Sequence, residues 1–120
     1  MERLITLCLL LPACLTAAPK LSETPAIAVF EAKKNITHAS VRIPALLMTA
    51  KGTLIAIAEA RDKATYQAGN DLVVATSKDQ GKQWSKPVIA YEQGGDSCNN
   101  PCLVQDAKSG RVFLFFQTFP

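Results

Sequence analysis

Two arginines in residues 41–61 have the chemistry to bind a carboxylate. The segment reads VRIPALLMTAKGTLIAIAEAR, in which two apolar runs meet at Lys51-Gly52. This pattern predicts a β-hairpin, and a symmetric two-residue turn at Lys51-Gly52 places Arg42 directly opposite Arg61. Like charges opposed on a sheet cost about 0.2–1 kcal/mol. We therefore expect an anion between these two side chains.

The anion has two possible sources. One is internal, because arginines beside acids commonly form surface ion pairs, and the acids of this region are Glu59, Asp62 and Glu31. The other is a bound carboxylate ligand, which the planar guanidinium group grips in bidentate fashion better than a lysine ammonium does. The residues alone leave both open. A three-residue turn would shift the register by one and remove the direct opposition.

The elements that position these arginines read as short β-strands. Apolar runs alternate with turn signals, and no stretch has a helical period over the length of a helix. The runs are AIAVFEA (26–32), SVRIPALLMT (40–49), GTLIAIAEAR (52–61), NDLVVATS (70–77), KPVIAYE (86–92), NPCLVQD (100–106) and RVFLFFQT (111–118). This spacing predicts an all-β fold, either an antiparallel meander, a sandwich or a propeller.

Pro44 restricts where the strand that carries Arg42 can lie in a sheet. Proline removes a ladder donor, so it is confined to edges and bulges of sheets. In a propeller the innermost strand of a blade is such an edge, and it faces the central channel where Arg42 would lie. At about 40–50 residues per four-stranded blade, residues 19–120 make about two blades. We therefore expect this chain to be the front part of a longer protein.

The segment SKDQGKQWS, residues 77–85, has the spacing S-x-D-x-G-x-x-W. Gly81 permits the positive φ of a tight hairpin turn. Ser77 and Asp79 have short side chains suited to accepting hydrogen bonds from turn amides. Trp84, the only tryptophan, supplies an apolar ring to cover the hairpin. The pattern predicts a self-contained turn with a structural role.

The first eighteen residues form a separate segment. Arg3 supplies a positive start, LITLCLLLPAC is apolar, and Thr16-Ala17-Ala18 ends in small residues before Pro19. This predicts a secretory signal peptide over residues 1–18, too short for a membrane span, and a secreted, periplasmic or cell-surface location for residues 19–120. A lipid anchor on Cys14 is the alternative.

Composition excludes some partners. The formal net charge is +3 and the basic residues are scattered, so no nucleic-acid partner is expected. Without the leader, Cys98 and Cys102 remain, and either a small disulfide between them or a buried free Cys102 is consistent with the sequence. Because His38 is the only histidine, we expect no zinc site. We also expect no other metal and no cofactor.

Taken together, these motifs resemble the exo-sialidases, also called neuraminidases. Arg42-Ile43-Pro44 is similar to their R-I-P motif, and residues 77–84 are similar to their Asp-box, the BNR repeat. NNPCLVQDAKSGRVFLFFQTFP at the end of the chain resembles the next blade in the bacterial branch. The resemblance covers nearly all of residues 40–120. It implies the front part of a six-bladed propeller that releases terminal sialic acid from glycoconjugates.

The resemblance also implies roles for individual residues. Arg42 and Arg61 match two arginines that hold the sugar carboxylate. The family's acid/base aspartate lies in the loop after Arg61, where Asp62 is the only acid and Tyr66 stands nearer the expected place. Asp62 is thus either that acid or a salt-bridge partner for an arginine, and Tyr66 is either a sugar-stacking ring or a loop anchor. The nucleophilic tyrosine and its glutamate would lie beyond residue 120.

Three functional hypotheses follow. The first is a glycoside hydrolase that acts on sialylated or other acidic glycans. The second is a non-catalytic or differently specific propeller that binds acidic glycans through the same arginines. The third is a structural or interaction propeller with no sugar site, in which Arg42 and Arg61 pair only with internal acids. The absence of the family's aspartate from its usual place favours the second hypothesis.

Overall fold

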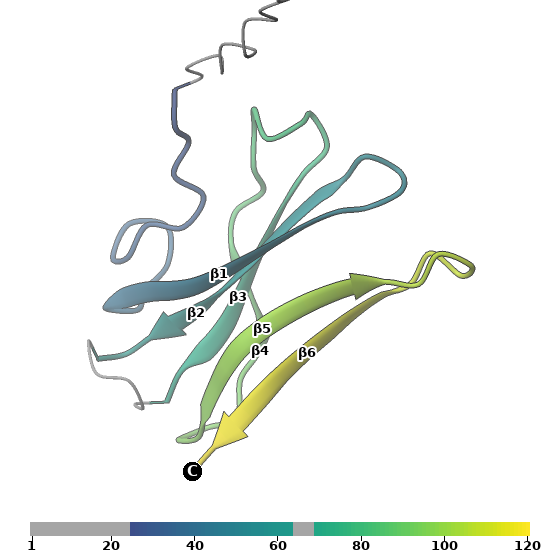
Figure 1. Ribbon diagram of the computed structural model, residues 1–120. Helices are drawn as coiled ribbons and strands as arrows, with labels where there is room; N and C mark the ends of the chain where they lie inside the picture. Colours follow the sequence, from purple (N-terminus) through teal and green to yellow (C-terminus); the bar gives the residue numbers. More distant parts are fainter. Residues whose placement is uncertain (1–24, 64–68) are drawn as a thin grey trace, which may run out of the picture.

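The computed structural model describes residues 25–63 and 69–120, which contain six strands in two antiparallel sheets (Figure 1). The first sheet has the order β1-β2-β3-β4, and the second pairs β5 with β6. The strands are β1 (Ser40–Met48), β2 (Leu54–Arg61), β3 (Asp71–Ser77), β4 (Val88–Tyr91), β5 (Ser97–Gln105) and β6 (Val112–Phe119). The prediction of an all-β fold is confirmed. Within the described ranges, no helix has the length and apolar character needed to cross a membrane.

Six of the seven apolar runs form these strands, and the first run does not. Residues 25–39 contain only an isolated bridge between Ala32 and Ile36. The Asn35 side chain gives the reason, because its Oδ1 accepts the Glu31 amide at 2.7 Å and its Nδ2 donates to the Val29 carbonyl at 2.9 Å. These local bonds occupy backbone groups that a strand would pair with a neighbour. The prediction of a strand at 26–32 was wrong.

The β1–β2 hairpin closes with a three-residue loop, residues 50–52. The Thr49 amide donates to the Thr53 carbonyl at 2.8 Å, and the Gly52 amide donates to the Thr49 carbonyl at 2.8 Å. Gly52 has a φ of 80°, a left-handed conformation that suits glycine in a three-residue hairpin loop. The loop sets the register in which Met48 faces Leu54. The prediction of a symmetric two-residue turn was therefore wrong.

A β-bulge at Ile43-Pro44 shifts the register of β1 again. Arg42 pairs with Glu59 and Ala45 pairs with Ile57, so two residues of β1 lie opposite one residue of β2. Proline has no amide to donate to the ladder, and β1 is an edge strand, as Pro44 predicted. Ile43 has a φ of 49°, which is strained for a β-branched residue.

The same bulge recurs in the second sheet at Asn100-Pro101. Asn99 pairs with Gln117 and Cys102 pairs with Phe115, which again places two residues of the first strand opposite one residue of the second. Asn100 has a φ of 54°, close to that of Ile43. The two hairpins β1–β2 and β5–β6 are thus structural repeats, each with an X-Pro bulge in its first strand.

The strand β2 is the most buried strand because both of its faces are covered. On one face Ala58 and Ala60 pack with Ile36 and Val73 beneath the N-terminal segment. On the other face Ile57 belongs to a second cluster of side chains from both sheets: Leu72, Cys98, Ala45, Leu103, Leu114 and Phe116. Burial on both faces explains why β2 reads as a nearly continuous apolar run instead of an alternating one.

The turn after β3 is held by its own side chains. Ser77 Oγ accepts the Gly81 amide at 2.9 Å, and Asp79 Oδ1 accepts the Gln83 amide at 2.9 Å. Trp84 Nε1 donates to the Gly81 carbonyl at 3.0 Å, and Gly81 has a φ of 86°. These contacts confirm the predicted positive φ and the predicted side-chain bonds to turn amides.

The hydrogen bonds of this turn also act on the Asp79 carboxyl. The Gln83 amide and then the Ser77 hydroxyl lower the pKa of Asp79 below its ordinary value of 3.8. A carboxyl with a lowered pKa in the folded state contributes stability above pH 3.8, and this contribution is lost as the pH falls through the lowered pKa. The ionised carboxylate of Asp79 therefore stabilises the turn at neutral pH.

Candidate functional site

The two arginines lie near the end of the first sheet that is opposite the β1–β2 loop, but they are not directly opposed. Arg61 pairs with Ser40, and Arg42 pairs with Glu59. The prediction of direct opposition was wrong because the three-residue loop and the bulge each shift the register by one residue. Directly paired residues and residues two apart share a face of a sheet, so Arg42, Glu59 and Arg61 still lie on one face.

Glu59 and Arg61 form a buried ion pair on that face. The side chain of Glu59 is 1% exposed and that of Arg61 is 4% exposed. Glu59 Oε2 accepts the Arg61 Nε–H at 3.0 Å and an Nη2–H at 2.5 Å, which makes a charge-assisted fork. The internal acid that the sequence offered as one source of the anion is therefore present for Arg61, and it is Glu59.

Arg42 is in a different environment. It is exposed at the edge strand, and within residues 25–63 and 69–120 the structure gives its side chain no hydrogen bond or ion pair. Glu59 lies opposite Arg42 in the register, but its carboxylate is bonded to Arg61 and to the Asn100 amide. The face thus carries one neutralised guanidinium group inside the protein and one charged guanidinium group at the surface.

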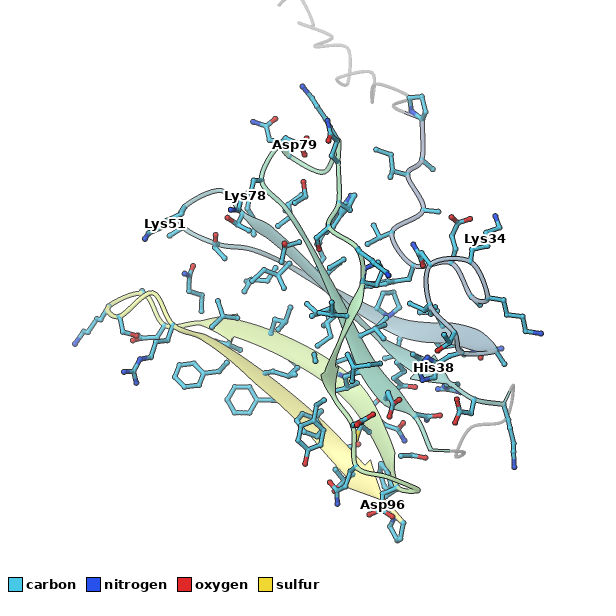
Figure 2. The ribbon with its side chains drawn as sticks, turned by 180° about the vertical axis from the view of Figure 1, so that it is seen from behind. Lys34, His38, Lys51, Lys78, Asp79 and Asp96 are labelled. Atoms are coloured by element: carbon cyan, nitrogen blue, oxygen red, sulfur yellow. The ribbon has the colours of Figure 1, made fainter. Side chains whose placement is uncertain are left out.

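Asp62 lies beside a histidine at this end of the sheet. Its Oδ1 is 3.7 Å from His38 Nε2, and its side chain is 67% exposed. The same ring nitrogen of the buried His38 is 2.9 Å from Asp71 Oδ2, at the start of β3. Figure 2 shows His38 at the end of the sheet opposite the loops that carry Lys51, Lys78 and Asp79. The turn at residues 77–84 is therefore remote from the face that carries Arg42, Glu59 and Arg61, which we call the arginine face.

The remaining residues named from the sequence have mixed outcomes. Tyr66 and the leader, residues 1–18, lie outside the described residues. Cys98 is a free, buried thiol and Cys102 is a free, exposed thiol, so neither a disulfide nor a buried Cys102 is found. The reason is the bulge between the two cysteines. It puts Cys98, which pairs with Thr118, and Cys102, which pairs with Phe115, on opposite faces of β5.

Two participants in this region were missed in the sequence. Asn100 donates its backbone amide to Glu59 Oε1 at 2.8 Å, and His38 bridges two acids. The Asn-Pro pair within an apolar run is a signal for a bulge, and a bulge frees a backbone amide from the ladder. The position of His38 has no comparable local signal, since its partners follow it by 24 and 33 residues in the sequence.

Comparison with known proteins identifies the family. The model of the BNR repeat-like domain matches residues 52–120, more than half of the chain, so the chain belongs to this family. An anhydrosialidase of Macrobdella decora is 29% identical over an alignment of 103 residues, and the match covers 66% of this chain and 14% of that relative. The expected relationship to sialidases is confirmed.

Solved structures define the fold class more closely. The NanB sialidase of Streptococcus pneumoniae matches with a TM-score of 0.74 and 22% identity over 81% of this chain and 18% of that chain. An intramolecular trans-sialidase of Ruminococcus gnavus matches with a TM-score of 0.69 and 29% identity over 78% of this chain and 24% of that chain. The two sheets are therefore part of a sialidase-type β-propeller. The chain spans between 14% and 24% of the lengths of these relatives.

Proposed function

We propose that this chain is part of a sialidase-like glycoside hydrolase that removes terminal sialic acid from glycoconjugates. The observation that supports this most is the exposed Arg42, which has no partner among the described residues and shares a face with Arg61. A guanidinium group at a strand edge is suited to bind a sugar carboxylate in bidentate fashion. The relatives named as sialidases supply the substrate class.

The two arginines make different contributions in this proposal. Arg42 supplies the net positive charge that attracts the carboxylate. Arg61 is neutralised by Glu59, so it contributes directed N–H groups and little net charge. Asp62 is proposed as the general acid, and Tyr66 as a ring that contacts the sugar. Residues 77–84 are proposed as the family's Asp-box, and residues 1–18 as a leader that directs the protein to secretion, with lipidation of Cys14 as the alternative.

The first prediction concerns Arg42→Ala in the full-length protein. We expect kcat/KM on a fluorogenic sialoside to fall about 10–100-fold, because hydrogen bonds to a charged group contribute about 1.5–3 kcal/mol. Arg111→Ala is the matched control, since Arg111 is an exposed arginine that precedes β6. Equal rates for Arg42→Ala and the wild-type protein contradict the clamp, and no release by a folded wild-type protein rejects the hydrolase.

Binding of acidic glycans without turnover is the second candidate. It is favoured by the position of Asp62, which directly follows the buried Arg61 and contacts His38. Asp62→Asn separates the two candidates in the same assay. A hydrolase that uses Asp62 as its acid loses about 10²–10⁴-fold in rate and retains affinity, whereas a binding protein shows saturable binding and no turnover in either form.

A further inference from the structure

Glu59 bonds to both sheets of the protein. Its Oε2 accepts two N–H groups of Arg61 in its own strand, and its Oε1 accepts the backbone amide of Asn100 in β5 at 2.8 Å. The carboxylate is almost fully buried, and both of its oxygens are hydrogen-bonded. Such a pair is stable in the interior because the charge is compensated and the remaining lone pairs are used.

The bulge in β5 is the reason that a backbone amide is available to Glu59. Asn100 is in the left-handed conformation at the bulge, so its N–H leaves the β5–β6 ladder. The Asn100 side chain turns to β6, where Nδ2 donates to Gln117 Oε1 at 2.9 Å. The position of the Asn100 amide is therefore fixed by the second sheet and not by the first.

These contacts restrict the direction of the Arg61 side chain. A guanidinium group bonded through Nε and Nη2 to one carboxylate oxygen has a fixed plane, and the carboxylate is itself fixed by Asn100. A binding group held in one orientation before the ligand arrives loses less conformational entropy on binding. The orientation of Arg61 thus depends on a residue of the first sheet and on a bulge of the second.

We propose that Glu59 is a positioning residue, which holds Arg61 in the orientation that binds an anionic sugar and makes this orientation depend on the packing of the two sheets. The inference rests on the proposed carboxylate-binding function of the arginine face. Glu59 itself does not contact the ligand and acts through Arg61.

The test is a double-mutant cycle in the full-length protein. Glu59→Gln keeps an oxygen for the Asn100 amide but turns an NH₂ group toward Arg61. The probe is oseltamivir carboxylate, the ligand of the Ruminococcus gnavus structure, with affinity measured by isothermal titration calorimetry. We expect Glu59→Gln to lower the affinity about tenfold and Arg61→Ala to lower it by a similar or larger factor. The double variant should bind no more weakly than Arg61→Ala alone. The proposal is overturned if Glu59→Gln lowers the affinity by the same factor in the wild-type protein and in Arg61→Ala. It is also overturned if Glu59→Gln does not lower the affinity.

Arg61→Lys covers the case in which Glu59→Gln does not fold. Lysine keeps a positive charge beside Glu59 but lacks the planar fork, so we expect a loss of affinity comparable to that of Arg61→Ala in a protein with wild-type circular dichroism. Wild-type affinity in Arg61→Lys shows that the orientation of the fork is irrelevant and overturns the proposal.

A measurement without ligand separates this inference from the proposed function. In protein labelled with ¹⁵N-arginine, the Arg61 Nε–H is assigned by its loss in Arg61→Lys. We expect it to exchange slowly with water in the wild type and at least about tenfold faster in Glu59→Gln. This result supports positioning even if the probe does not bind, in which case the proposed function alone fails. Fast exchange of the Arg61 Nε–H in the wild type overturns the positioning role.

Discussion

The guanidinium group of Arg61 is buried, whereas that of Arg42, on the same face of the sheet, is exposed to solvent. The difference follows from the strands that carry them, since β2 is covered on both faces and β1 is an edge. A buried guanidinium group needs a counter-charge, and Glu59 supplies it two residues away on the same strand. At the scale of the residue, position in the sheet thus determines which arginine is available to attract an anion.

The two thiols of β5 should differ in reactivity for the same kind of reason. Burial, with further contributions from Asp71 and Asp96, raises the pKa of Cys98, and a lower thiolate fraction slows alkylation. We expect iodoacetamide to modify the exposed Cys102 readily and Cys98 only after denaturation, as measured by peptide mass spectrometry on residues 19–120 at low concentration. A Cys98–Cys102 disulfide or equal labelling would contradict the bulged register of β5.

At the scale of the element, bulges and turns position the side chains of the candidate site. The X-Pro bulge of β1 places Arg42 opposite Glu59, and the equivalent bulge of β5 provides the Asn100 amide. The turn at residues 77–84 lies near the β1–β2 loop, since Ser77 pairs with Leu54, and a β-carbon on Gly81 would meet Leu54 Cδ1 at 3.4 Å. We interpret this turn as a support for the sheet and not as a binding element.

Gly81→Ala tests the role of this turn. An alanine at a φ of 86° is strained by about 1–2 kcal/mol, so we expect the free energy of unfolding to fall by about this amount. Gly95→Ala is the control, because a β-carbon there meets nothing within 4 Å and Gly95 has no positive φ, and its effect should stay within about 0.5 kcal/mol. Urea denaturation of the full-length protein measures both, and equal effects would refute the strained turn.

At the scale of the whole molecule, the second sheet has an uncovered apolar face. Directly paired residues place Cys102 beside Phe115 and Val104 beside Phe113, and the two phenylalanines are 59% and 47% exposed. The equivalent face of the first sheet, with Ala45 and Ile57, is covered by the second sheet. In a propeller the next blade covers such a face, so its exposure here is expected for a chain that spans a small part of its relatives.

Residues 19–120 alone should therefore self-associate. We expect the weight-average mass in sedimentation equilibrium to rise with concentration, and Phe115→Lys to shift this rise to at least about tenfold higher concentration, because exposed apolar faces drive association. Gln83→Lys adds the same charge at an exposed position in the turn between β3 and β4, away from the second sheet, and should leave the association unchanged. A strictly monomeric wild-type fragment would contradict this expectation.

The local features of this protein are determined by its sequence. Six strands, the edge position of β1 and the bonds of the turn at residues 77–84 depend on residue type and on neighbours a few positions away. The register, the Glu59–Arg61 pair and the separation of Cys98 from Cys102 were decided by the tertiary structure. Because side chains alternate between the faces of a strand, a one-residue shift at a loop or bulge changes every later pairing, and only the packing of both sheets determines where such shifts occur.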